Sequence, residues 1–233
     1  MKIKFFILPG ILCSAILFLS WNQPYAPAAL PAGYHDTISD IDGNEIYTVI
    51  IGKQEWTVHN LNTEHFRNGD AIPQAITIEE WIQAWKEKRP AWCYYEGKKP
   101  SSRYVGKLYN FYAMTDPRGI APKGWRVPSP KDWDELITLM GGFDAAGKCL
   151  KFWYGWTGDN TGTNSSGFKA LPGGYRNENG NFYNNTKVAN WWIAPDAPNA
   201  APSCMELHTD PIPMRIEARL LPGYGISIRC IKE

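Results

Sequence analysis

The stretch KGWRVPSPKDWDELITLMGG, Lys123–Gly142, combines a turn with a strongly marked helix. Ser129 is a good N-cap residue, Pro130 suits the first helical position, and Asp132 stands at N3, where a carboxylate favours the positive helix end. Apolar residues then recur at i, i+3, i+4 and i+7 before two glycines end the helix; they are Trp133, Leu136, Ile137 and Met140. We expect a strand end, a stiff turn and a short helix whose apolar side faces inward.

This interpretation assigns the stretch to the frame of the fold and not to a catalytic centre. Trp125 and Trp133 should pack beneath the domain. We expect Arg126 to bond backbone carbonyl groups and not a substrate.

Two turn-forming dipeptides nearer the N-terminus predict β-strands on either side of them. Asp42-Gly43 lies between β-prone runs and is typical of a hairpin. We favour this over a calcium loop made by Asp40, Asp42 and Asn44, because the oxygen spacing does not fit an EF-hand. Gly52-Lys53 indicates a second turn.

Two further elements complete the predicted frame. Thr77–Pro90 has a capping-box pattern and an apolar stripe at helical spacing, which predicts a first helix whose tryptophans are core. The alternating C-terminal run around Ile226, Ile228 and Ile231 should form a strand that pairs with an early one.

The composition is that of a globular domain rich in aromatic residues and glycine. The 233 residues include 11 Trp, 12 Tyr and 21 Gly, which favours short strands, many turns and wide loops. The formal net charge is +1 and no basic stripe is present that could neutralise a run of phosphates. We therefore expect no nucleic-acid partner.

The N-terminus resembles a targeting segment. Lys2 and Lys4 precede an apolar run that ends at Trp21, as in a secretory signal. We expect export to the cell envelope, the outer surface or the medium, with contact to a membrane only through this segment. Residues 1–28 would be a signal peptide or N-terminal anchor, 29–35 a linker, and 36–233 one domain.

Cysteine usage fits an exported chain. Cys13 suggests a lipoprotein alternative, although the large Leu12 before it and the continuing apolar run argue against lipidation. The remaining cysteines are even in number, allow three disulfide pairings and lack C-x-x-C spacing, and two or more of them could also stay free; they are Cys93, Cys149, Cys204 and Cys230.

The half of the chain beyond Trp153 has no helical period and many glycines, asparagines and aromatic residues, which predicts an ordered, loop-rich lobe. Exposed rings there could stack on sugars or anchor a protein interface, and the alternative is that they form the core of the lobe. The candidate ligand-binding residues are Trp153, Trp156, Tyr175, Arg176, Tyr183, Trp191 and Trp192.

The sequence predicts no catalytic residues and no cofactor other than calcium. The four histidines lack H-x-H and H-E-x-x-H spacing, and His59 and His65, which flank a turn, are expected at the surface. No G-x-S-x-G elbow is present. The loop around Asp159 could bind calcium only weakly, because it carries one carboxylate.

Seven segments together resemble the Fibrobacter succinogenes major paralogous domain family, in the family's order and over about residues 36–232. They are DIDGNEIYTVIIGKQEWTVHNL, NGDAIP, GKLYNFYAM, PKGWRVPSPKDWDEL, SGFKALPGGYRNENGNFY, NWW and ISIRCIKE. The resemblance extends to formylglycine-generating enzymes and C-type-lectin-like domains. It implies an α+β, C-type-lectin-like fold with two short helices, small twisted antiparallel sheets and a long loop-rich lobe.

The chain departs from the family pattern at its cysteines. Ala121 stands where the family commonly has a cysteine, whose usual partner would be Cys230 or Cys93, and Cys149 and Cys204 are not part of the family pattern. The pairing that we infer is Cys93–Cys230 and Cys149–Cys204. The function expected from residues and resemblance together is a binding or adhesion module for an extracellular glycan or protein. The alternatives are a metal-dependent oxidative enzyme of formylglycine-generating type and a purely structural surface protein.

Overall fold

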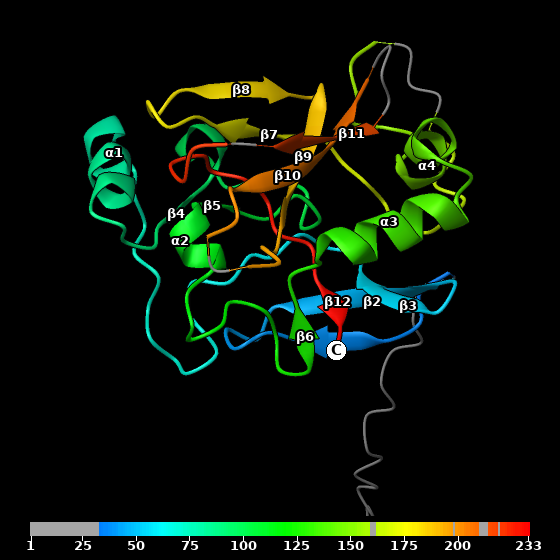
Figure 1. The fold of residues 1–233 in the computed structure, drawn as a ribbon, viewed down its shortest axis with the longest axis horizontal. Coiled ribbons are helices and arrows are strands. Elements are labelled where there is room, and N and C mark those ends of the chain that lie inside the picture. The colour runs from blue at the N-terminus through cyan, green and yellow to red at the C-terminus, as the bar shows by residue number, and fades with distance from the viewer. Residues whose placement is uncertain (1–32, 159–161, 198, 210–213, 219) are drawn as a thin grey trace, which may run out of the picture.

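A five-stranded antiparallel sheet forms one side of the molecule, in the order β1-β2-β3-β12-β6 (Figure 1). The computed structural model describes residues 33–158, 162–197, 199–209, 214–218 and 220–233. Both predicted hairpin turns are confirmed, since β1 pairs with β2 across Asp42-Gly43 and β2 pairs with β3 across Gly52-Lys53. The strands are β1 Thr37–Ser39, β2 Glu45–Ile51, β3 Gln54–Thr57, β6 Trp125–Arg126 and β12 Ile231–Lys232.

A C-terminal strand closes this sheet, as predicted, but it is confined to Ile231–Lys232, and Ile226 forms only an isolated bridge with Tyr109. Ile231 of β12 lies opposite Trp56 of β3 on one side and opposite Arg126 of β6 on the other. The two ends of the described chain are therefore tied together by backbone hydrogen bonds.

Three smaller antiparallel sheets make up the rest of the described β-structure. The largest has the order β11-β10-β9, and the other two are the pairs β4-β5 and β7-β8. Their bounds are β4 Trp92–Cys93, β5 Leu108–Tyr109, β7 Gly173–Arg176, β8 Phe182–Asn185, β9 Val188–Ile193, β10 Ser203–His208 and β11 Met214–Ala218. The fold is therefore α+β with small antiparallel sheets.

The described chain has four α-helices, so the expectation of two was wrong. Both predicted helices form and have complete capping boxes, at Thr77 with Glu80 and at Ser129 with Asp132. The two missed helices are short, and α4 begins directly after Gly142, where the sequence pattern indicated only an end. The helices are α1 Ile78–Lys86, α2 Phe111–Met114, α3 Pro130–Leu139 and α4 Phe143–Leu150, with a short 3-10 helix at Tyr95–Gly97.

The main core lies between the five-stranded sheet and the β9–β11 sheet, and α3 and α4 contribute to it. Trp56, Trp133 and Trp191 meet there, with ring centroids 4.9 Å apart for the first two and 5.8 Å for the last two. Trp125 belongs to a second cluster and Trp81 of α1 to a third. The prediction that Trp125 and Trp133 pack inside the domain is confirmed.

Arg126 differs from its prediction. Its guanidinium forms a two-point ion pair with Asp132, with Nη2 2.8 Å from Oδ1, instead of bonding backbone carbonyls. The same carboxylate accepts the backbone N–H and the hydroxyl of Ser129. One side chain therefore joins the β6 strand to the cap of α3, and charge assistance strengthens both links.

Asp132 gives the fold a testable dependence on pH. Burial raises the pKa of its carboxyl, but hydrogen bonds from Arg126 and Ser129 outweigh this, and the net pKa lies below the ordinary value. A depressed pKa contributes stability above about pH 4 that is lost as pH falls through the folded-state pKa. Asp132→Asn should therefore be less stable than wild type at pH 7, and the gap should shrink below about pH 4.

Urea unfolding of both proteins between pH 2 and 7 measures this gap. Titration of the other carboxylates affects both proteins alike, so the difference isolates Asp132. A difference that stays constant down to pH 2 would contradict the assignment.

Candidate functional site

Four of the seven predicted ligand contacts are buried and cannot present a face to a ligand. Trp191 and Trp192 are fully buried, Arg176 is 1% exposed and Trp156 is 9% exposed. Trp191 donates to Asn60 Oδ1 at 2.8 Å, and Trp192 donates to a backbone carbonyl at the same distance. For Trp191 and Trp192 the reason is that β9 is covered on both faces, so that neighbouring side chains of the strand are all buried. Arg176 at the end of β7 and Trp156 between the elements are enclosed by packing inside the domain.

Arg176 links two parts of the fold through hydrogen bonds from its guanidinium. It donates to the carbonyls of Gly180, Ala75 and Thr77, which ties the β7–β8 hairpin to the start of α1. Its guanidinium also lies 4.8 Å from the ring centroid of Trp81. The structure thus assigns Arg176 to the core.

The three remaining candidates keep open ring surface but do not form one platform. Trp153 is 62% exposed and packs on Phe152, with centroids 3.9 Å apart. Tyr183 is 43% exposed and stacks on the half-buried Tyr175, which stacks in turn on Tyr224.

The four cysteines of the domain are free, so neither predicted disulfide is present. Cys93 lies in the cluster around α1, while Cys204 and Cys230 lie in another cluster and Cys149 is on α4. Burial raises the pKa of the Cys93 thiol to about 11. The buried thiols behave as small apolar core groups.

The metal predictions divide into two parts. Asp159, the calcium candidate, lies outside the described residues. Over the described part of the chain, no three His, Cys, Asp or Glu side chains gather in a way that could hold a metal ion.

Among the described residues, no helix has both the length and the apolar character needed to cross a membrane.

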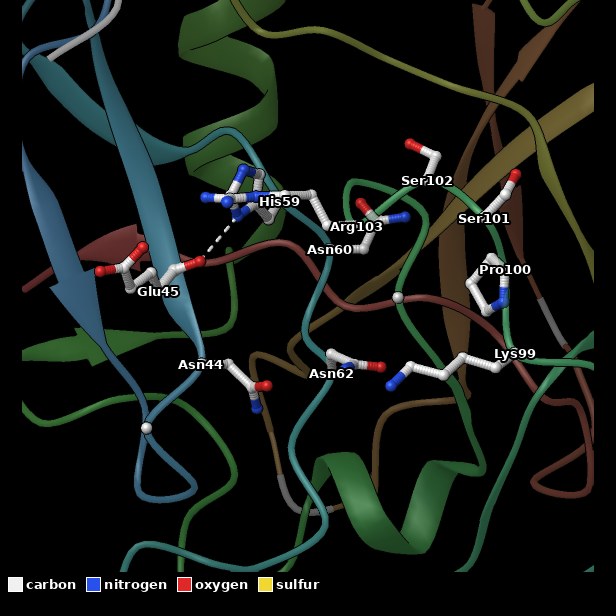
Figure 2. A pocket seen from close by; sticks show the side chains of 12 residues that line it. Asn44, Glu45, His59, Asn60, Asn62, Lys99, Pro100, Ser101, Ser102 and Arg103 are labelled. Carbon is white, nitrogen blue, oxygen red and sulfur yellow. Dashed lines mark hydrogen bonds between the residues drawn. The ribbon is translucent and has the colours of Figure 1, made fainter.

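The structure brings together a polar cavity that the sequence did not indicate (Figure 2). The cavity measures about 440 Å³. Its lining residues come from three segments, 43–45, 59–62 and 99–106. A volume of this size falls in the range of about 300–1,000 Å³ that is typical of small-ligand sites. The run KKPSSR at Lys98–Arg103 was the available signal, as a polar loop between strands.

The floor of this polar cavity is held rigidly. Asn60 accepts from Trp191 and from Arg229 through Oδ1, and its Nδ2 donates to the Val105 carbonyl at 2.9 Å. Gly106 has a φ of +68°, and a Cβ at this position would lie 2.3 Å from the Leu61 carbonyl oxygen. The loop is therefore fixed against the 59–62 segment at one defined distance.

His59 forms part of the wall and was wrongly expected at the surface. It is 2% exposed, and its Nδ1 lies 3.1 Å from the Glu45 carbonyl oxygen, which can only accept, so Nδ1 carries the proton. Burial, with the positive charges of Arg103, Arg229 and Lys169, lowers the pKa of His59 to about 3. The ring is neutral at pH 7, and its Nε2 is a buried acceptor without a partner among the described residues.

The loop side of the polar cavity carries polar groups that the described fold does not use. The Ser101 hydroxyl and the Lys99 ammonium form no hydrogen bond to any described residue. The Arg103 guanidinium lies 4.6 Å from the centroid of the Tyr47 ring, and its charge acts on His59. Figure 2 shows Lys99 extending from the loop towards Asn62. Asn62 Oδ1 is occupied by Lys107 and Tyr94.

A second hollow of about 470 Å³ lies against the same loop. Lys99 and Ser101 line both hollows, and Tyr95 and Tyr154 line only the second. Tyr154 is 52% exposed, so an aromatic face lies next to the polar cavity.

The model of the Fibrobacter succinogenes major domain matches residues 49–232. The chain belongs to this family. The Fibrobacter succinogenes major domain includes the cavity segments 59–62 and 99–106, while residues 43–45 precede the matched range. No curated protein and no solved structure matches the chain.

Proposed function

We propose that this protein is an exported binding module that takes a glycan into the polar cavity. One observation carries the proposal: a wall with unpaired donors and acceptors, such as Ser101, Lys99 and His59 Nε2, stands on a floor fixed by Asn60 and Gly106. Saccharides present many hydroxyl groups that need directional hydrogen bonds, and a preformed polar site supplies them without ordering cost.

The neighbouring hollow supports a glycan more than a protein ligand. The exposed ring of Tyr154 offers a face for stacking on a sugar, at the far side of the loop from the cavity. One sugar unit of an oligosaccharide could therefore be hydrogen-bonded in the polar cavity while the next unit stacks on Tyr154. Protein interfaces instead rely on aromatic and apolar anchors that are fully desolvated.

We also propose that the domain has a C-type-lectin-like fold. The pairing of β12 with β3 in one sheet and the two capped helices are in keeping with this architecture. The proposal of export is supported by the N-terminal segment, residues 1–28, which lies outside the described residues.

A glycan array tests the proposed function. We expect the purified domain to bind a defined set of glycans. Ser101→Trp should abolish this binding, because Ser101 is exposed and lines both hollows, so that an indole there obstructs a ligand that enters either of them. Ser165→Trp, at an exposed serine that lines neither hollow, is the matched control and should bind like wild type.

Four results would count against the proposal. Failure to bind any glycan would favour the structural alternative, and stoichiometric copper or iron in the purified protein would favour the oxidative enzyme. Equal binding by Ser101→Trp and wild type would place the site elsewhere. Capture of a protein partner that Ser101→Trp blocks would assign the polar cavity to a protein ligand.

A further inference from the structure

Two cations at the rim of the polar cavity have no acidic partner. Lys99 and Arg103 form no ion pair with any residue of the described ranges. Several other cations of the domain do pair with acids, since Arg118 pairs with Asp116, Arg126 with Asp132 and Lys98 with Glu96. The two free charges of this loop therefore face a hollow and not a carboxylate.

Further positive charge lies behind the lining residues of the polar cavity, around His59. Arg103, Arg229 and Lys169 all act on His59, and no carboxylate has a comparable effect on this ring. Arg229 is fully buried, its hydrogen bonds go to Asn60 and to backbone carbonyls, and its guanidinium lies over the rings of Phe168 and Trp191. Its Nη2 lacks a hydrogen-bond partner among the described residues. Positive charge within low-dielectric walls focuses the field into the hollow.

The acidic groups near the polar cavity do not cancel this field. Glu45 is the one acid among the lining residues, and Figure 2 shows its carboxylate pointing away from Lys99 and the two serines. The Asp40 carboxylate accepts from Asn44, and the Asp42 carboxylate accepts from Thr63 and pairs with His65.

We infer that the polar cavity selects saccharides carrying an anionic group, a carboxylate or a sulfate, which Arg103 and Lys99 bind while the remaining wall groups bind hydroxyls. This rests on the proposed glycan-binding function and names the class of its ligand. Arg103 offers a planar fork of N–H donors that matches a carboxylate or sulfate at two points, and Lys99 adds a point charge.

The test is a glycan array that carries oligosaccharides with a uronate, a sialic acid or a sulfate group. Each is printed beside its neutral counterpart, which is the carboxyl-reduced form of the first two kinds and the desulfated form of the third. Wild type should retain the anionic member of a pair at least about tenfold better than the neutral one. Arg103→Gln should remove this preference while keeping weak binding to both members, and Arg103→Lys should keep part of it. Binding should weaken as salt rises from about 50 to 500 mM.

The control is Arg215→Gln on β11, which pairs with Glu206 and lies outside the cavity, and it should keep the preference. Thermal unfolding of each variant shows that the fold is intact. The carboxylate and sulfate sets distinguish the two sources of negative charge. Equal binding of charged and neutral members by wild type would overturn the inference and leave the proposed function standing. Binding of neither member of any pair, on this array and on the broad one, would overturn both.

Discussion

Trp191→Ala should lower the free energy of unfolding by about 3–5 kcal/mol. The side chain is fully buried between Trp133 and Phe168, with centroids 5.8 and 5.5 Å away, so its removal leaves a cavity that a rigid core cannot close. The substitution also removes one of the two hydrogen bonds that Asn60 Oδ1 accepts, and the bond from Arg229 remains. Urea unfolding monitored by far-ultraviolet circular dichroism measures the change.

Trp153→Ala is the matched control for this prediction. Trp153 is 62% exposed, and a surface truncation of this kind should change the free energy of unfolding by about 0.5 kcal/mol or less. A loss at Trp191 as small as the one expected at Trp153 would mean that Trp191 is not a core residue, and its ring would again be a candidate ligand contact.

Gly106→Ala should destabilise the domain by about 3 kcal/mol and displace the cavity loop. A left-handed φ alone costs a residue with a Cβ about 1–2 kcal/mol, and here the Cβ also meets the Leu61 carbonyl oxygen at 2.3 Å and the Asn60 carbonyl oxygen at 2.8 Å. Relief requires the 99–106 loop to move away from the 59–62 segment, so glycan binding should fall as well. Denaturant unfolding and array binding measure the two effects.

Gly124→Ala separates the effect of the steric clash of the Cβ from the effect of the left-handed backbone conformation. Gly124 has a similar φ of +79°, but a Cβ there meets nothing within 4 Å. This variant should lose only about 1 kcal/mol and should bind glycans like wild type. Equal losses at both glycines would contradict the account of the close loop contact.

Elements with local signals could be predicted from the sequence. The start of α3 is specified by three residues of one four-residue stretch, Ser129, Pro130 and Asp132. The turn between β1 and β2 is specified by the dipeptide Asp42-Gly43. The closing strand around Ile231 was predicted because its alternating pattern needs a partner. Each of these signals depends on groups that are neighbours in the chain as well as in space.

Burial of whole strands and assembly of the polar cavity could not be predicted in this way. Trp191 and Trp192 point to opposite faces of β9, and only the packed structure shows that both faces are covered. The polar cavity depends on the approach of the 99–106 loop to His59 and Asn60, about forty residues earlier in the chain. Arg126 was misassigned because its partner, Asp132, was already explained as a helix cap.

The most direct test of the central claim is a crystal structure of the domain with the oligosaccharide that the array retains most strongly. The account predicts a sugar ring in the polar cavity, in contact with Ser101 and Arg103, and His59 Nε2 within hydrogen-bond distance of a ligand hydroxyl or of a water molecule that bridges to one. A saccharide bound on the Tyr175–Tyr183–Tyr224 stack or over Trp153, with no contact to the polar cavity, would contradict it.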